Sequence, residues 1–502
     1  MSILNSLFSL PFSGRKRAAK IFKKEPAEIQ FRVLKNLIGK AKKTKWGRLY
    51  GYAKIKTLAQ FQARVPLQTY EDLCPYIERM QKKEKNILWP GKIVGFAKSS
   101  GTTGAKSKFI PVTRDSLKKC HYRCGTDLLA SYVKENNNSG LLSGKILTLG
   151  GSRKKNEADF YVGDLSAILM SNLPFWTYFS RTPELDIALL DEWEEKLNKI
   201  IEYSSKQNIT CLMGVPSWMM VLMYRLLEKT GKKNILEIWP NLELFIHGGI
   251  SFEPYREQFK KIIPGVKMKY LEVYNASEGF FARNENSGDT DMLLSLDYGI
   301  FYEFIPFEEL NNPKPKILSI ADVEINKNYA LVISTNGGLW RYLIGDTIIF
   351  TSLNPPKIKI SGRTKHYINA FGEELMVGNA DKGLEEACLK TGAEIREYSA
   401  APVYIEGKNS GRHQWLIEFS KQPADLNKFM EILDTTLKSL NSDYEAKRHK
   451  DISLGFPELI IARDGLFYEW LKNKSKLGGQ NKVPRLANTR EYIDELLKLN
   501  HH

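Results

Sequence analysis

From about residue 90 to residue 275, short runs of β-type residues alternate with amphipathic helical segments, and this alternation limits the fold more than any other feature. Several of the β-type runs are followed closely by glycine. Strands that alternate with helices in this way are typical of an α/β domain. We therefore predict largely parallel sheets, with strands at 93–97, 109–112, 145–149, 209–213, 242–246 and 267–273 and helices at 191–204 and 217–230.

The regions on either side have different patterns. Residues 1–90 are mainly amphipathic helix, and the apolar spacing is clearest over 29–38. Residues 296–360 are richer in strand signals, with strands expected at 299–305, 329–335, 347–351 and 357–361. Beyond them we expect a compact α+β unit with helices at 377–390 and 423–440 and strands at 400–406, 414–419 and 458–462. Its size suits an independent domain, so we predict a large domain over 1–361 and a small, mobile domain over 362–502.

Composition narrows the class of protein. A hydrophobic content of 42% excludes global disorder, and no apolar run approaches the roughly 18 residues of a membrane helix. The apolar N-terminal stretch precedes its positive charges, which is the wrong order for a secretory signal. Five cysteines in 502 residues fit a reducing compartment. We therefore expect a cytoplasmic protein.

The net charge of +17 favours anionic partners such as nucleic acid, anionic lipid or a nucleotide. No RNA- or DNA-binding signature accompanies the charge, so a lysine-rich solvated face is the simpler interpretation. Residues 1–25 combine apolar residues with a basic cluster, and a patch of this kind supports only weak peripheral membrane contact. We expect no specific nucleic-acid partner and no transmembrane segment.

The most distinctive local feature is the loop Ser99-Ser100-Gly101-Thr102-Thr103-Gly104 between two predicted strands. Its small residues allow the backbone to approach a phosphate closely, and its N–H groups and hydroxyls can bind an anion. The loop is not a Walker A motif, because no Gly-Lys-Ser/Thr follows at the required spacing. A plain surface hairpin turn is the alternative.

Two further segments suit a nucleotide. Tyr274-Asn275-Ala276-Ser277-Glu278 follows a predicted strand, where ligands bind in α/β sheets. There Tyr274 can stack on a base, Ser277 can bond a phosphate, and Glu278 can hold Mg²⁺. Asp346 is expected at the mouth of a strand, where it can accept both ribose hydroxyls. A polar loop and a turn aspartate are the respective alternatives.

Three weaker segments remain. Arg363 belongs to a basic hinge at the expected domain boundary, and Lys482 belongs to a basic stretch near the C-terminus, whose alternative is a solvated tail. Gly249 ends the small-residue segment after the strand at 242–246. An apolar segment that contains Val215, Trp218 and Met219 is a candidate acyl pocket by position, although apolar residues at this spacing are more often core.

Taken in order, these segments resemble the motifs of the Gretchen Hagen family of acyl-acid amido synthetases, known from auxin-responsive plant proteins and part of the acyl-adenylate-forming superfamily. The family motif Ser-Ser-Gly-Thr-Ser/Thr corresponds to 99–103, Tyr-x-x-Ser-Glu to 274–278, Arg-Tyr-x-Val-Gly-Asp to 341–346 with Ile344 for Val, and Lys-x-Pro-Arg to 482–485. Ala105 stands where plant members tend to have glycine. The segment after Gly362 is closer to bacterial members and to acyl-CoA ligases, so we identify a bacterial-type member.

The resemblance implies an ATP-dependent ligase that adenylates a carboxylic acid and transfers the acyl group to an amine, with an amino acid as the expected acceptor. It implies a large N-terminal α/β domain with a β-rich portion and a mobile C-terminal domain. ATP and Mg²⁺ are the implied cofactors. Glu278 would place the metal and Lys482 would stabilise charge at the α-phosphate. The segment His247-Gly248-Gly249 resembles the one that borders the adenine in adenylating enzymes, and a tight turn packed under the sheet is its alternative. The residues implied to hold ATP are Ser99, Ser100, Gly101, Thr102, Thr103, Gly249, Tyr274, Ser277, Asp346 and Arg363.

Two rival functions stay open. An acyl-CoA ligase would share the adenylation step and differ only in its acceptor. A non-catalytic nucleotide- or nucleic-acid-binding protein would explain the basic charge, but it would have no need for Glu278, Asp346 and a lysine on a separate domain.

Overall fold

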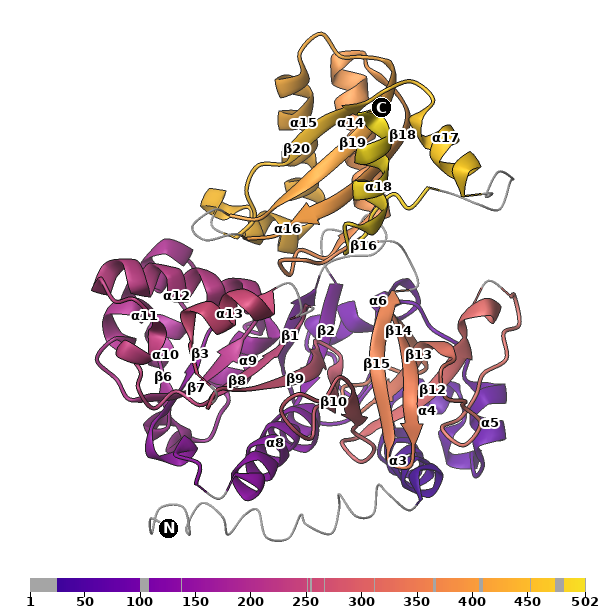
Figure 1. The fold of residues 1–502 in the computed structure, drawn as a ribbon. Helices are drawn as coiled ribbons and strands as arrows, with labels where there is room; N and C mark the ends of the chain where they lie inside the picture. The colour runs from indigo at the N-terminus through magenta and orange to yellow at the C-terminus, as the bar shows by residue number, and fades with distance from the viewer. Residues whose placement is uncertain are drawn as a thin grey trace.

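The computed structural model describes residues 25–99, 108–136, 138–250, 252, 255–265, 267–310, 312–363, 367–405, 410–451, 453–474 and 483–501. A large body holds the indigo to salmon part of the chain, and a small orange and yellow body lies against one end of it (Figure 1). The linking segments between the two bodies follow β15, which is Pro356–Arg363.

One eleven-stranded sheet spans the large body. Its first half is parallel and runs in the order β9, β8, β7, β3, β6, with Ile246 opposite Leu271 in the pairing of β8 with β9. From β9 onward every pairing is antiparallel, through β10, β11, β15, β14 and β13 to β12. The bounds are β3 Lys145–Thr148, β6 Arg181–Thr182, β7 Ile209–Gly214, β8 Leu244–Gly248, β9 Lys269–Ala276, β10 Gly279–Arg283, β11 Met292–Leu294, β12 Ile300–Pro306, β13 Asn328–Thr335 and β14 Tyr342–Leu353.

Helices cover both faces of the parallel half, which explains its uninterrupted apolar strands. On one face α11 (Trp193–Ser204), α12 (Pro216–Thr230) and α13 (Arg256–Ile262) share a core with β3, β7 and β8. On the other face Leu128 and Tyr132 of α8 (Tyr122–Glu135) pack on Leu244 and Leu271. Proline at the first position of α12 and a left-handed glycine after its last residue set the ends of that helix.

The antiparallel half is covered by N-terminal helices (Figure 1). The amide of Gln30 on α3 donates to the carbonyl oxygens of Leu296 and Ile300 and accepts from Tyr302 N, so α3 is fastened to β12. The amphipathic helix predicted over 29–38 is therefore confirmed. The helices here are α3 Pro26–Ala41, α4 Lys45–Leu49, α5 Leu58–Arg64 and α6 Tyr70–Gln81.

A second, four-stranded sheet carries the segment of the first motif. Its order is β2-β1-β5-β4, with β1 antiparallel to β2 and parallel to β5. The strands are β1 Ile93–Ser99, β2 Lys108–Thr113, β4 Arg153–Lys155 and β5 Tyr161–Gly163. Short elements of the large body are α7 Arg114–Ser116, a π-helical turn at Leu117–His121, α9 Leu165–Ser171, α10 Leu185–Ala188 and single 3₁₀ turns at Tyr52–Lys54, Leu141–Ser143, Phe175–Phe179, Ile235–Glu237 and Phe307–Glu309.

The small body is an α+β unit around the three-stranded sheet β18-β19-β20. Residues of α14 and α15 share a core with one face of the sheet, and residues of α17 and α18 pack on the other. Its elements are β16 Tyr367–Ile368, β17 Leu375–Met376, α14 Val377–Thr391, β18 Glu394–Val403, β19 Arg412–Lys421, α15 Leu426–Leu440, α16 Ser442–Lys447, a 3₁₀ turn at His449–Asp451, β20 Glu458–Ala462, α17 Leu466–Asn473 and α18 Glu491–Asn500.

The predicted elements are present, and the differences lie at their ends. The strand expected over 400–406 begins earlier, at Glu394, and the strand expected over 347–351 begins at Tyr342. The division expected between residues 361 and 362 stays a prediction, and the large sheet ends at Arg363. In the part of the chain that the structure describes, no helix combines the length and apolarity that a membrane crossing requires.

Candidate active site

The first motif begins at the end of a β-hairpin. Ser99 ends β1 and pairs with Lys108, which begins β2. Ser100, Gly101, Thr102 and Thr103 lie outside the described residues, so their roles stay predictions. Lys108 is nearly buried, with its Nζ 3.4 Å from the Tyr342 hydroxyl oxygen and 5.8 Å from the centre of the Tyr70 ring. The base of the loop therefore contacts the segment of the third motif.

The second motif forms a tight hairpin in the large sheet. Ala276 of β9 pairs with Gly279 of β10, so Ser277 and Glu278 make a two-residue turn. This turn lies where the sheet changes from parallel to antiparallel pairing. A Cβ at Gly279 would lie 2.5 Å from Ile300 Cδ1, so close packing requires glycine at this position. We expected the motif directly after a strand, but Tyr274, Asn275 and Ala276 lie inside β9, and only Ser277 and Glu278 follow it. The hairpin continues the pairing through the motif and fixes its orientation.

The expected position of Asp346 at the mouth of a strand is wrong, because Asp346 lies inside β14. Between the pairs Val332–Leu343 and Ala330–Thr347 the register shifts, and Gly345 has a φ of +98°. The shift marks a β-bulge, which re-aims side chains and is common beside active sites. The strand therefore continues through the motif, and the bulge, rather than a strand end, orients Asp346.

Tyr274 and Asp346 are in contact although 72 positions separate them in the sequence. The Tyr274 hydroxyl donates a hydrogen bond of 2.5 Å to Asp346 Oδ2, and both side chains are largely buried. Asp346 also stands opposite Arg363 in the pairing of β14 with β15. The second and third motifs and the hinge residue Arg363 therefore lie at one place in the sheet. Nothing is described of the Arg363 side chain, so its predicted contact with ATP stays a prediction.

Burial raises the pKa of Glu278 to about 7. The carboxylates of Asp346 and Glu374 add to the rise, and the ammonium of Lys108 opposes it. An anionic carboxylate of this kind is costly without a cation nearby. Carboxylate oxygens are the ligands that Mg²⁺ prefers in proteins, so the residues present fit the magnesium site predicted at Glu278.

The predicted adenine segment lies at the junction of the two bodies. Gly249 follows β8 with a φ of +85°, and its carbonyl oxygen accepts a 2.9 Å hydrogen bond from the Asn369 side chain. A Cβ at Gly249 would lie 3.6 Å from a methyl carbon of Val215. Next to it, burial lowers the pKa of His247 to about 3, so this histidine is neutral and stacks on Phe252.

The predicted pocket residues separate into different environments. Val215 immediately precedes α12 and lies beside Gly249 of the adenine segment. Trp218 lies in the first turn of α12 with its ring centre 3.8 Å from that of Trp193. Met219 is also on α12 and is completely buried in the core that α12 shares with the sheet. Val215 and Trp218 therefore reach the junction, whereas Met219 has the environment of a core residue.

Several residues near the site were absent from the sequence-based list. The π-helical turn Leu117–His121 packs on the second motif, because Cys120 Sγ accepts a hydrogen bond from Phe280 N. Burial lowers the pKa of His121 to about 4, and Asn275 lies beside it. Such turns often occur at functional sites, but this one has no sequence signature. The other residues missed are Tyr342, Glu374 and Lys447; Lys482 lies outside the described residues.

Comparison with known proteins identifies the family. The profile of the GH3 family N-terminal domain matches residues 15–268, just over half of the chain. The chain belongs to the GH3 (Gretchen Hagen) family. Profiles of the GH3 family central and C-terminal domains match residues 293–363 and 378–491 of this GH3 protein.

Named relatives of this GH3 protein are plant enzymes. The indole-3-acetic acid-amido synthetase GH3.3 of Arabidopsis thaliana is 23% identical, over 91% of this chain and 89% of the relative. The 4-substituted benzoates-glutamate ligase GH3.12 of the same species is 21% identical, over 85% of this chain and 87% of the relative. Both alignments span most of the two proteins.

Solved structures share the fold. The GH3.15 acyl acid amido synthetase has a TM-score of 0.61 at 18% identity, covering 97% of this chain and 95% of that one. A 2-hydroxyisobutyryl-CoA ligase in complex with 2-HIB-AMP and CoA has a TM-score of 0.59 at 13% identity, covering 95% and 92%. The family, fold class and enzyme class predicted from the motifs are confirmed by these matches.

Proposed function

We propose that this GH3 protein is an AMP-forming ligase that adenylates a carboxylic acid with ATP and transfers the acyl group to an amino acid. One observation carries the proposal. Tyr274 and Asp346, from two separate motifs, meet through a hydrogen bond beside the Glu278 turn and the base of the first loop. A nucleotide site needs its phosphate, ribose and metal groups gathered in this way.

The chemistry requires alignment and charge neutralisation rather than a covalent protein intermediate. An oxygen of the acid attacks the α-phosphorus of ATP, and the bond to pyrophosphate breaks. The acceptor nitrogen then attacks the acyl carbon and loses a proton, and the bond to AMP breaks. Both steps move negative charge on or beside the phosphate, so cationic and N–H donor groups have to surround it.

The residues of this chain divide that work. Asp346 accepts the ribose hydroxyls, and the Tyr274 hydroxyl fixes its carboxylate. Lys108 brings a buried positive charge to the base of the phosphate loop. Glu278 would hold Mg²⁺, and the bound ion would neutralise phosphate charge. Lys482 is assigned to the α-phosphate by its motif alone.

The remaining ATP contacts and the acid site follow the motifs. Ser277 lies in the hairpin turn beside Glu278, and Gly249 presents backbone at the junction. Val215 and Trp218 border the acyl site in this proposal. We keep a location in the cytoplasm and the large and small domains over 1–361 and 362–502 as predictions.

An acyl-CoA ligase is the second candidate, and a specific observation favours keeping it. The 2-hydroxyisobutyryl-CoA ligase shares the fold over nearly the whole chain. The fold alone therefore leaves the acceptor open. The named GH3 relatives are amido synthetases, which favours an amine.

The test is pyrophosphate release from ATP and Mg²⁺ across a panel of carboxylic acids, with each amino acid or coenzyme A added in turn. Acid-dependent release together with faster turnover in the presence of an amino acid supports the proposal. Faster turnover with coenzyme A alone supports the rival ligase. If no ATP binds at all, measured calorimetrically, the nucleotide site is refuted.

A further inference from the structure

A lysine of the small body projects into the junction with the large body. Lys447 is the last residue of α16, and its Nζ lies 4.1 Å from the centre of the Trp218 ring on α12. This contact joins the two bodies at the proposed acyl site. A Cβ at Gly372, which has a φ of +90°, would lie 3.0 Å from Lys447 Cε, so glycine leaves room for the lysine.

The backbone that carries Lys447 is firmly held. Its carbonyl oxygen accepts hydrogen bonds from Leu454 N and the Ser453 hydroxyl. At the other end of α16, Asn441 caps the helix and donates to the carbonyl oxygens of Glu373 and Glu374. The helix is therefore tied to the segment that follows β16, and the lysine is presented from a rigid support.

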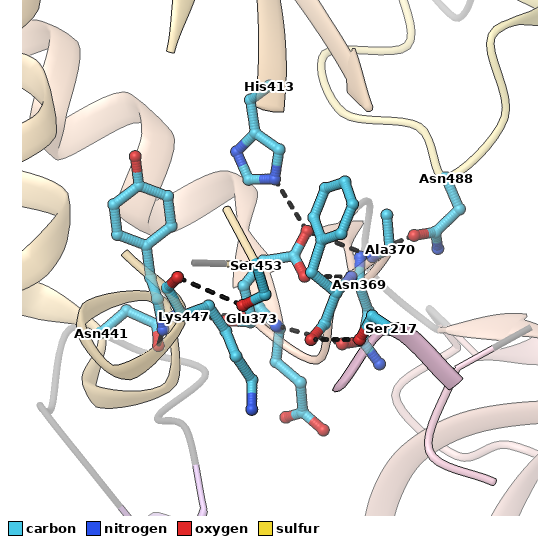
Figure 2. Close-up of polar contacts among 12 residues, drawn as sticks. Ser217, Asn369, Ala370, Glu373, His413, Asn441, Lys447, Ser453 and Asn488 are labelled. Atoms are coloured by element: carbon cyan, nitrogen blue, oxygen red, sulfur yellow. Dashed lines mark hydrogen bonds and ion pairs between the residues drawn. The ribbon is translucent and has the colours of Figure 1, made fainter. Parts of the chain in front are cut away.

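That segment, residues 369–374, also contacts the large body. Tyr255 donates to Ala370 O at 2.7 Å, and Ser217 donates to Phe371 O at 3.3 Å. Glu373 is completely buried, and its carboxylate accepts from Ala370 N, Phe371 N and His413 Nε2. Figure 2 shows the Lys447 side chain pointing away from this network. The Glu373 carboxylate is thus already fully engaged.

The electrostatic surroundings of Lys447 are set by carboxylates at longer range. Among the described residues, no carboxylate lies within ion-pairing distance of its Nζ. Burial lowers the pKa of Lys447, and carboxylates at longer range oppose that change. These carboxylates, from both bodies, are Asp443, Asp164, Glu373 and Glu374.

The tryptophan pair Trp193 and Trp218, which Lys447 contacts through Trp218, also carries unpaired donors. The indole N–H groups of Trp193 and Trp218 are buried and have no hydrogen-bond partner among the residues that the structure describes. Buried donors without partners are uncommon and point to a polar ligand or water. The ammonium and the unpaired N–H groups suit a carboxylate, the Trp218 face holds the ammonium in place, and the nearby acidic residues suit an amine.

The geometry points to Lys447 as the group that binds the carboxylate of the acceptor amino acid. This inference rests on the proposed function. The carboxylate of the acid substrate becomes part of the anhydride with AMP, whereas the acceptor carboxylate keeps its charge through the transfer and needs a cation. Glu374 acts electrostatically on both Glu278 and Lys447, so the lysine shares a neighbour with the nucleotide site.

The test compares the best amino acid acceptor with its α-carboxamide, which keeps the amine and loses the negative charge. In Lys447→Met, we expect KM for the amino acid to rise about 10–100-fold relative to wild type, as for loss of a charge-assisted hydrogen bond. We expect KM for the carboxamide to change much less. Each acyl-transfer rate from which KM is obtained is divided by the acid-dependent pyrophosphate release rate of the same variant.

Two further variants keep the test decisive. Lys447→Arg retains the charge and should recover part of the lost affinity for the amino acid. Lys428→Met removes an exposed lysine from α15 and is the matched control. Equal losses for the amino acid and its carboxamide in Lys447→Met would overturn the assignment. Failure of the wild-type protein to release pyrophosphate with any acid would instead refute the proposed function.

Discussion

At the scale of single residues, Glu278 carries the clearest conflict between stability and function. Its carboxylate is partly removed from water and lies near the carboxylates of Asp346 and Glu374, and its pKa rises to about 7. A raised acid pKa means that the folded protein binds the proton more tightly than the unfolded chain does. Stability is therefore lost as pH rises from the unfolded value, near 4.5, through about 7.

The variant Glu278→Gln should separate these effects. Because the amide carries no charge, we expect its melting temperature at pH 8 to exceed that of the wild type by about 1–3 °C without ATP. The difference should shrink at pH 5. Adenylation should fall about a hundredfold or more, because the metal loses its carboxylate. Calorimetry at both pH values and pyrophosphate release provide the measurements, and a lower melting temperature at pH 8 would contradict the electrostatic account.

Tyr274 should act through Asp346. In Tyr274→Phe the carboxylate loses the hydroxyl that orients it, and we expect KM for ATP to rise about 3–10-fold with a smaller change in kcat. Tyr468→Phe, an exposed tyrosine on α17, is the control. Unchanged KM for ATP in Tyr274→Phe would argue against Asp346 as the ribose ligand.

At the scale of elements, β14 depends on Arg341, which precedes it. The guanidinium forms two hydrogen bonds with the carboxylate of Glu303 on β12, at 2.9 and 3.0 Å, and both side chains are nearly inaccessible. It also donates to the carbonyl oxygens of Gln62 in α5 and of Val65, which follows α5. Arg341 belongs to the third motif by sequence, but its contacts join the sheet to the N-terminal helices.

Arg341→Met should therefore destabilise the protein. Loss of one partner leaves the Glu303 charge buried without compensation, and we expect the free energy of unfolding to fall by about 3–5 kcal/mol. Urea unfolding measures this, and the double variant Arg341→Met with Glu303→Leu should recover part of the loss. Full stability together with a raised KM for ATP would instead place Arg341 in the nucleotide site.

At the scale of the whole molecule, the two bodies share a hydrophobic cluster and specific polar contacts. Asn369 reaches Gly249, Tyr255 reaches Ala370, and Lys447 covers Trp218. The segment 369–374 lies in the middle of these contacts. The adenine segment, the acyl candidates and the small body therefore share one junction, so residues contributed by the small body can act on a substrate held by the large one.

Lys482 lies outside the described residues, and its motif predicts such a contribution. From its motif, we expect Lys482→Ala to reduce acid-dependent pyrophosphate release about a hundredfold or more. The melting temperature should stay within about 1 °C of the wild type, as for a surface substitution. Transfer from acyl-AMP prepared separately should be affected less than adenylation. Equal loss in both steps would show that the lysine serves the whole cycle rather than its first half.

The sequence by itself determined the elements and the family. Buried parallel strands between helices produce continuous apolar runs, and these runs could be recognised in the sequence of residues 93–276. Four short motifs in order identified the GH3 family, because phosphate, ribose and metal each require particular side chains. The bulge at Gly345 could not be predicted from the sequence, because a strand that accommodates extra residues has no local sequence signature. Asp346 was therefore placed at the end of a strand.

Only the tertiary structure decided which of these groups meet. The contacts of Tyr274 with Asp346 and of Lys447 with Trp218 join residues far apart in the chain. Sheet register and packing at the junction set these contacts, and neither depends on neighbouring residues in the sequence. The raised pKa of Glu278 and the lowered pKa of Lys447 arise from burial, which exists only in the folded chain.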